Sequence, residues 1–173
     1  SFPNTLNTLM GIESNYLLRI GDANIPNNQL QVATSVNNCT SADLQLESGK
    51  WYHVAVAFNK GNVKVYINGV EKLSGSTGKS SVSLGAKHTN EEDGSRCFWV
   101  GYSYKDDRYF DGVVSEVRIW NRALTAEEIQ ATNHFYTVEP ESEGLIAYWK
   151  FDEGSGTVAK DYSVSGYDLT IEK

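Results

Sequence analysis

The sequence predicts an all-β protein, an antiparallel sandwich of two sheets with one short helix. Apolar residues alternate with a period of two along several short segments, as they do on strands with one buried face. Clusters of Gly, Asn, Ser and Asp separate these segments, and almost no helical pattern lies between them. Aromatic residues make up 12% of the 173 residues, against one Met and three Pro, which suits a well-packed sheet.

The central prediction is a hairpin. The large side chains of Tyr52, Val54, Val56 and Phe58 alternate with small ones, and a second alternating run covers residues 63–67. The intervening Asn-Lys-Gly-Asn sequence and the Asn-Gly pair that follows the second run are turn signals. The other expected strands cover residues 16–20, 29–33, 43–46, 82–84, 98–102, 113–120, 146–151, 157–162 and 167–171.

One helix start is well defined. Thr125 and Glu128 have the spacing of a capping box, in which each side chain bonds the backbone N–H of the other residue. Leu124 before the cap and Ile129 after it can form the accompanying hydrophobic contact, so a short helix is expected over residues 126–132. A Glu-rich segment at 138–143, interrupted by Pro140, reads as a solvated connector before the last strands.

Composition excludes several classes of function. The chain has 15 basic and 22 acidic residues, a net charge of −7, and no basic cluster, so neither nucleic acid nor an anionic membrane is an expected partner. No apolar run approaches the length of a transmembrane segment. The two cysteines, Cys39 and Cys97, are too few for a disulfide framework or a four-ligand zinc site, and they either pair with each other or stay free.

Three segments together resemble the laminin G-like, concanavalin A-like jelly-roll family. GKWYHVAVAF at 49–58, running into VKVYING at 63–69, resembles the central hairpin of these modules. Residues 112–129, GVVSEVRIWNRALTAEEI, resemble their closing strand and short helix. AYWKFDEGSG at 147–156, with DYSVSG at 161–166, is similar to their opening strand. The resemblance implies a jelly-roll fold in which Trp51, Trp120 and Trp149 are framework residues.

The order of the segments departs from the family pattern, because the opening-strand motif comes last and the N-terminus carries no equivalent strand. This motif either begins a second, truncated repeat or folds back onto this sandwich. We expect the second arrangement, a single domain over 1–173 that residues 144–173 complete in permuted order after the connector.

The resemblance implies either a binding module or, less often, a glucan-cleaving enzyme. Hydrolysis needs two carboxyl groups across one glycosidic bond. The nearest match to the Glu-x-Asp-x-Glu strand of jelly-roll glucanases is Glu-Pro-Glu-Ser-Glu at 139–143, where the proline interrupts strand pairing. His53, His88 and His134 are scattered and no nucleophile elbow accompanies them. We therefore expect no enzymatic activity.

Sugar binding needs an exposed aromatic face and polar groups that fix hydroxyls. The loop 101–112 combines such residues between two strands, where a rigid sandwich places recognition. The expected ligand-binding residues are Tyr102, Tyr104, Asp106, Asp107, Arg108, Tyr109 and Asp111, with Trp99 on the preceding strand. The alternative is a polar hairpin loop whose aromatic side chains fold down onto the sheet. Asp22, Asn24, Asn27, Asn28, Asn37 and Asn38 form a second, weaker candidate edge.

Calcium is the one possible cofactor, because Asp106, Asp107 and Asp111 offer oxygen ligands. The pentraxin branch of this fold has acidic residues directly after the strand that corresponds to residues 98–101, and here Tyr-Ser-Tyr-Lys at 102–105 replaces them. The predicted function is a non-catalytic carbohydrate-binding module of a secreted, cell-surface or periplasmic protein, with a glycan as partner. The alternatives are a module that binds another surface protein or acts as a structural spacer and, more weakly, a glycoside hydrolase.

Overall fold

The structure, a computed structural model, describes residues 7–13, 15–22, 25–83, 97–103 and 108–172. The chain divides into two compact units, residues 1–112 and residues 113–173. Each unit is built from antiparallel strands, as the alternation of apolar residues predicts.

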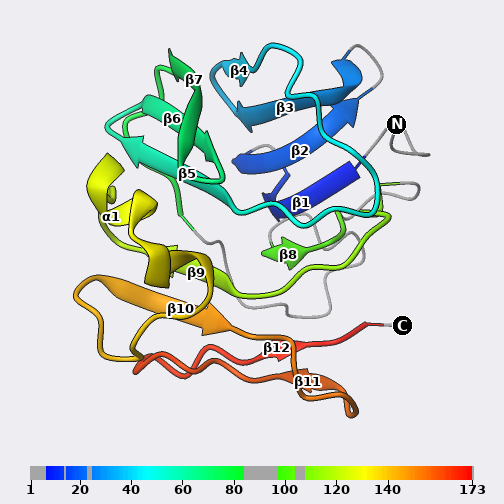
Figure 1. Cartoon of the computed structure of the whole chain (residues 1–173), viewed down its shortest axis with the longest axis vertical. Helices are drawn as coiled ribbons and strands as arrows, with labels where there is room; N and C mark the ends of the chain where they lie inside the picture. Colours follow the sequence, from blue (N-terminus) through cyan, green and yellow to red (C-terminus); the bar gives the residue numbers. More distant parts are fainter. Residues whose placement is uncertain (1–6, 14, 23–24, 84–96, 104–107, 173) are drawn as a thin grey trace. The chain divides into compact units, whose positions relative to one another are not determined.

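The first unit contains a five-stranded antiparallel sheet in the order β4-β3-β2-β1-β8 (Figure 1). Its strands are β1 (Asn7–Ile12), β2 (Tyr16–Asp22), β3 (Ile25–Thr34), β4 (Asn38–Thr40) and β8 (Trp99–Val100). The pairing of β1 with β2 contains a register shift between Thr8 and Met10. Such bulges change the direction of the strand that carries them.

The second sheet of this unit has the order β5-β6-β7. Its strands are β5 (Val54–Asn59), β6 (Asn62–Ile67) and β7 (Val70–Ser76). Lys60 and Gly61 join the first two strands with φ angles of 48° and 88°, and Asn68 and Gly69 join the next pair with 50° and 76°. Two consecutive residues with positive φ define the hairpin turn that matches strand twist, which confirms both predicted turns.

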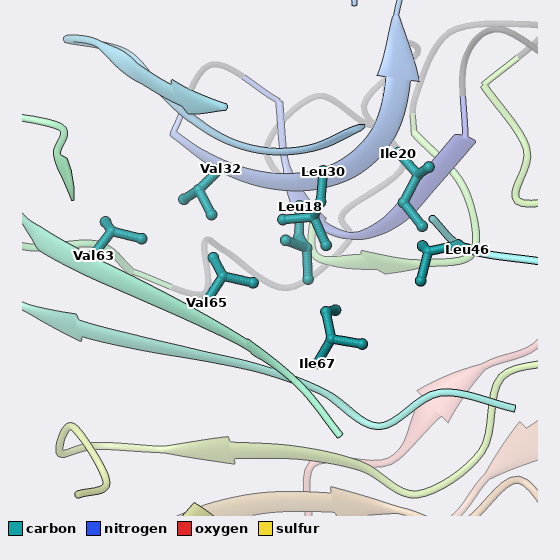
Figure 2. Close-up of a cluster of buried hydrophobic side chains, with 8 residues drawn as sticks. All are labelled: Leu18, Ile20, Leu30, Val32, Leu46, Val63, Val65 and Ile67. Atoms are coloured by element: carbon teal, nitrogen blue, oxygen red, sulfur yellow. The ribbon is translucent and has the colours of Figure 1, made fainter. Parts of the chain in front are cut away.

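The two sheets of the first unit enclose its hydrophobic core, as Figure 2 shows. One sheet contributes Leu18, Ile20, Leu30 and Val32, the other contributes Val63, Val65 and Ile67, and Leu46 enters from a loop. All eight side chains are at most 9% exposed. Each stabilises the fold by about 1.5–3 kcal/mol relative to an exposed position. The predicted sandwich is confirmed in this unit.

The second unit pairs β9 (Val117–Trp120) with β10 (Leu145–Trp149) and β11 (Val158–Ala159) with β12 (Leu169–Thr170). Val138, Leu145 and Tyr148 form a small core, against which Trp120 and Tyr162 pack. The displaced opening-strand motif therefore pairs with the predicted closing strand. Whether residues 144–173 complete the sandwich in permuted order stays a prediction.

The predicted helix is present as α1 (Ala126–Gln130), followed by a 3₁₀ turn, η1 (Thr132–Phe135). Both hydrogen bonds of the capping box form, from Glu128 N to the Thr125 hydroxyl and from Thr125 N to the Glu128 carboxylate. The same carboxylate accepts hydrogen bonds from the Arg122 guanidinium at 2.7 and 2.9 Å. These hydrogen bonds lower the pKa of Glu128 to about 2.

Several predicted strands are wrong or shorter. Residues 43–46 form a loop in which the Asp43 carboxylate accepts a hydrogen bond from Gln45 N at 2.8 Å; their alternation arises because Leu44 and Leu46 pack on the core from that loop. The strand expected at 113–120 begins only at Val117, because Glu116 has a φ of 58°. Residues 82 and 83 are not in a strand, and residue 84 lies outside the described residues.

The N-terminal strand β1, which lies between β2 and β8, was not predicted. Trp51 is not a framework residue, since 67% of its surface is exposed; the chain enters β5 only at Val54. Trp149, in contrast, is buried as predicted. Both cysteines are buried, and no disulfide bond joins them.

Candidate functional site

Three aromatic side chains around the 101–112 loop form one cluster. The rings of Trp99 and Tyr102 meet edge to face with their centroids 5.1 Å apart, and Tyr102 stacks on Tyr109 at 4.9 Å with an interplanar angle of 29°. Tyr109 is the outermost member and is 54% exposed. The aromatic cluster, as we call these three residues, therefore presents one ring to solvent on a base of two others.

Backbone hydrogen bonds fix both ends of this loop. Gly101 N donates to the Leu9 carbonyl of β1 at 2.8 Å, and Phe110 N donates to the Gly101 carbonyl at 2.9 Å. Asp111 N lies 3.5 Å from the side-chain oxygen of Asn7, which is fully buried. The loop thus leaves and re-enters the sheet at one point, which holds the aromatic cluster against the edge of the five-stranded sheet.

Glu13 connects the loop to the turn between β1 and β2. Its carboxylate accepts a hydrogen bond from the hydroxyl of the buried Ser103 at 3.1 Å and lies 3.5 Å from the guanidinium of Arg108. The Glu13 and Arg108 side chains are 22% and 21% exposed. A half-buried carboxylate and guanidinium beside an exposed ring are the groups that fix sugar hydroxyls.

Glu13 also lines a shallow hollow of about 310 Å³ on the outer face of the five-stranded sheet. The hollow is lined by Glu13, Leu17, Arg19, Ala33, Thr34, Ser35 and Asn38. Register partners across an antiparallel sheet share a face. The pairing therefore places five residues in one row across the five strands: Trp99, Gly11, Leu17, Ala33 and Asn38. Within this row Gly11 lies between Trp99 of the aromatic cluster and the residues that line the hollow.

Two sets of contacts hold the hollow in shape. On its floor, the Arg19 guanidinium donates two hydrogen bonds to the Gln31 side-chain carbonyl at 2.6 and 3.0 Å, and the Gln31 amide donates to the Thr40 hydroxyl at 2.9 Å. At its rim, the Lys79 ammonium donates to the Asn15 carbonyl at 3.1 Å and to the Ser35 hydroxyl at 3.0 Å. Lys79 thereby ties the β1–β2 turn to the β3–β4 turn.

The structure brings together part of the predicted site. Trp99, Tyr102, Arg108 and Tyr109 lie together, and Asp111 is exposed at the end of the loop. Tyr104, Asp106 and Asp107 lie outside the described residues. Glu13 and the residues of the hollow were not predicted, apart from Asn38, because only the sheet pairing brings them to the loop.

The metal and catalytic predictions have no test in the described part of the chain. No group of three or more metal-ligating side chains occurs among the described residues, two of the three candidate calcium ligands lying outside them. The acidic segment at 139–143 forms turns and not a strand. The pKa of His134 is lowered, chiefly by burial and then by the charge of Arg118. The absence of enzymatic activity stays a prediction.

Within the described residues, no helix has the length and apolar character needed to cross a membrane.

Two facing antiparallel sheets with a common core, together with the comparisons, define the class as a concanavalin A-like β-sandwich. The chain belongs to the laminin G-like family described as the concanavalin A-like lectin/glucanases superfamily, whose profile matches residues 3–130. This match confirms the predicted family and fold class.

Two similar proteins are longer than this chain. A solved structure of a candidate carbohydrate-binding protein from Bacteroides ovatus is 28% identical, with a TM-score of 0.77, and the match covers 100% of this chain and 51% of that one. The human adhesion G-protein coupled receptor D1 is 34% identical over 85 residues, which are 46% of this chain and 8% of the receptor. The chain thus spans only a fraction of each relative.

Proposed function

We propose that this chain is a non-catalytic carbohydrate-binding module whose binding site is the aromatic cluster together with Glu13 and Arg108. The observation that carries the proposal is the stack of Tyr109 on Tyr102 beside a half-buried carboxylate and guanidinium. The likeness to the Bacteroides ovatus protein supports it. The family includes both lectins and glucanases, so the fold alone does not decide between them.

The binding chemistry follows from the geometry. The exposed face of Tyr109 can cover the C–H groups of one pyranose face, which removes apolar surface from water. Tyr102 beneath it keeps the ring in place, so little side-chain entropy is lost on binding. Glu13 can accept hydrogen bonds from sugar hydroxyls and Arg108 can donate them.

We expect Tyr109→Ala to weaken binding to any glycan that the wild-type protein binds on a glycan array by roughly tenfold or more, because the stacking face is lost. Tyr109→Phe should retain most of the affinity, since the ring remains. Tyr136→Ala is the matched control, because Tyr136 is even more exposed, at 72%, and lies in the other unit. Equal binding by wild type and Tyr109→Ala would contradict the assignment of the site.

We further propose that the protein that carries this module is secreted or attached to a cell surface. Membership of the laminin G-like family and the likeness to a segment of an adhesion receptor support this location. The proposed partner is a glycan. If the array shows no glycan ligand, the site instead favours a role in binding another surface protein. A pull-down experiment would test this role, because a protein that binds at the site should be captured by the wild type and not by a variant with Tyr109 substituted.

A further inference from the structure

We propose that the hollow beside the aromatic cluster is a subsite for the acetamido group of an N-acetylated hexosamine. This inference rests on the proposed glycan-binding function and names the class of sugar. The two sides of the hollow carry different hydrogen-bonding groups, and the floor of the hollow lies between these two sides.

One side of the hollow supplies hydrogen-bond donors. The Asn38 side-chain oxygen accepts a hydrogen bond from Thr34 N at 3.3 Å, which orients its NH₂ group as the remaining donor. The Ser35 hydroxyl accepts from Lys79 at 3.0 Å, so its own proton remains to be donated. In the described part of the chain, neither group has an acceptor within hydrogen-bond distance. The Thr34 hydroxyl, in contrast, is used within its own turn.

The other side supplies an acceptor. Glu13 follows β1, whereas Asn38 begins β4, and the sheet order β1-β2-β3-β4 separates them by the two strands of the floor. Both contacts to Glu13, from Ser103 and Arg108, are made by one carboxylate oxygen, Oε2. A carboxylate has about four acceptor positions, so Glu13 can accept further hydrogen bonds.

The floor between the two sides has an apolar part beside the Arg19 guanidinium, which is bonded to Gln31. Leu17 and Ala33 are register partners on β2 and β3, and both line the hollow. Donors on one side and the apolar part of the floor complement the carbonyl and the methyl group of an acetamido substituent, and the acceptor on the other side complements a hydroxyl of the same glycan. The amide C=O would face Asn38 and Ser35, its methyl group would rest on Leu17 and Ala33, and a hydroxyl elsewhere on the glycan would face Glu13, three strands away. Leaving a buried amide group unpaired is costly, so this arrangement also discriminates against other substituents.

The neighbouring aromatic cluster favours a sugar over a peptide as the source of this amide. Glu13 lines the hollow and contacts Ser103 and Arg108, which are the chain neighbours of Tyr102 and Tyr109, and Trp99 lies in the same row as Leu17 across Gly11. A pyranose ring stacked on Tyr109 would place one of its substituents in the neighbouring hollow. A peptide amide would make no use of the stacked rings.

The test compares two tetrasaccharides that differ only at C2, chitotetraose with acetamido groups and cellotetraose with hydroxyls, by calorimetric titration of the whole chain. We expect chitotetraose to bind roughly tenfold or more tightly. Asn38→Asp keeps the acceptor for Thr34 N but removes the donor, so the preference should fall to within about twofold while the melting temperature is retained. The amide NMR signals of Leu17 and Ala33 should shift with chitotetraose only.

Three outcomes would overturn the inference. Equal binding of both tetrasaccharides, each weakened by Tyr109→Ala, would leave the proposed glycan-binding function standing without the acetamido subsite. Binding of N-acetylalanine methylamide as tightly as chitotetraose would show that the hollow recognises peptide amides. Binding of neither tetrasaccharide would reject N-acetylated hexosamines, and the glycan array would then decide the broader function separately.

Discussion

Replacing Asp161 with alanine is expected to lower the free energy of unfolding of the unit formed by residues 113–173 by about 3–5 kcal/mol. Asp161 is 4% exposed, and its carboxylate accepts hydrogen bonds from the backbone N–H groups of Tyr148, Ser163 and Tyr167 at 2.7–2.8 Å. It also accepts one from the Ser163 hydroxyl at 2.9 Å. Alanine would leave three backbone donors without their acceptor, one of them on the fully buried Tyr148.

The expected effect depends on pH. Burial raises the pKa of Asp161, but the hydrogen bonds from Ser163, Tyr148 and Tyr167 outweigh it, so the pKa lies below its ordinary value. A carboxyl whose pKa is lower in the folded state contributes its full stabilisation above the unfolded pKa, near 4. This contribution is lost as the pH falls through the folded value. The difference between wild type and Asp161→Ala should therefore be constant from about pH 5 to 7 and shrink below about pH 4.

Urea unfolding followed by circular dichroism measures this difference, and hydrogen exchange at the amides of Tyr148, Ser163 and Tyr167 locates it. Asp152→Ala is the control, because Asp152 is an exposed acid on the same segment with no hydrogen-bond partner in the described part of the chain. A difference of less than about 1 kcal/mol between the two variants would show that solvent replaces the lost acceptor.

The elements that could be predicted are those whose signals are local. The two hairpin turns and the capping box depend on residues within four positions of each other, and all three are present. The alternation of Val63, Val65 and Ile67 in β6 arises because these residues face the core of the sandwich, although Tyr66 between them is also buried. The arrangement of the strands as a two-sheet sandwich is not contained in these local patterns, and the resemblance to the family supplied it.

The failures also have local causes. Residues 7–12 read NTLMGI, which breaks the alternation because the register shifts within the strand. Leu44 and Leu46 alternate like a strand but reach the core from a loop. Glu116 has a positive φ that no propensity scale predicts for Glu, and this shortens β9. In each case the tertiary structure overrides the period-two pattern.

The candidate site could be predicted only in part for a related reason. Aromatic residues gathered in one loop are visible in the sequence, and Trp99, Tyr102 and Tyr109 do form a cluster. Glu13 is separated from Ser103 by 90 positions, and only the pairing of β1 with β8 brings them together. The same sheet pairing brings Leu17, Ala33 and Asn38 into one row. A single sequence carries no signal for such contacts.

Replacing Gly11 with alanine is expected to cost about 3–5 kcal/mol of stability in the unit formed by residues 1–112. Gly11 has a φ of 136°, a backbone conformation that other residues rarely adopt. A Cβ atom there would lie 2.2 Å from the Tyr16 carbonyl oxygen and 2.8 Å from the Leu17 Cα. Both atoms belong to the backbone of β2, so β1 and β2 would have to separate.

Gly49→Ala is the matched control. Gly49 also has a positive φ, 79°, but a Cβ atom there would meet nothing within 4 Å, so alanine should cost only about 1–2 kcal/mol from the backbone conformation. Urea unfolding of Gly11→Ala and Gly49→Ala separates the cost of the backbone conformation from the cost of steric overlap with β2. Equal unfolding midpoints of the two variants would mean that β1 and β2 adjust to the added Cβ atom at no cost. Because Gly11 pairs with both Leu17 and Trp99, a shift of β1 would also move the hollow away from the aromatic cluster. Gly11→Ala should therefore weaken glycan binding even where the variant remains folded, whereas Gly49→Ala should leave it unchanged.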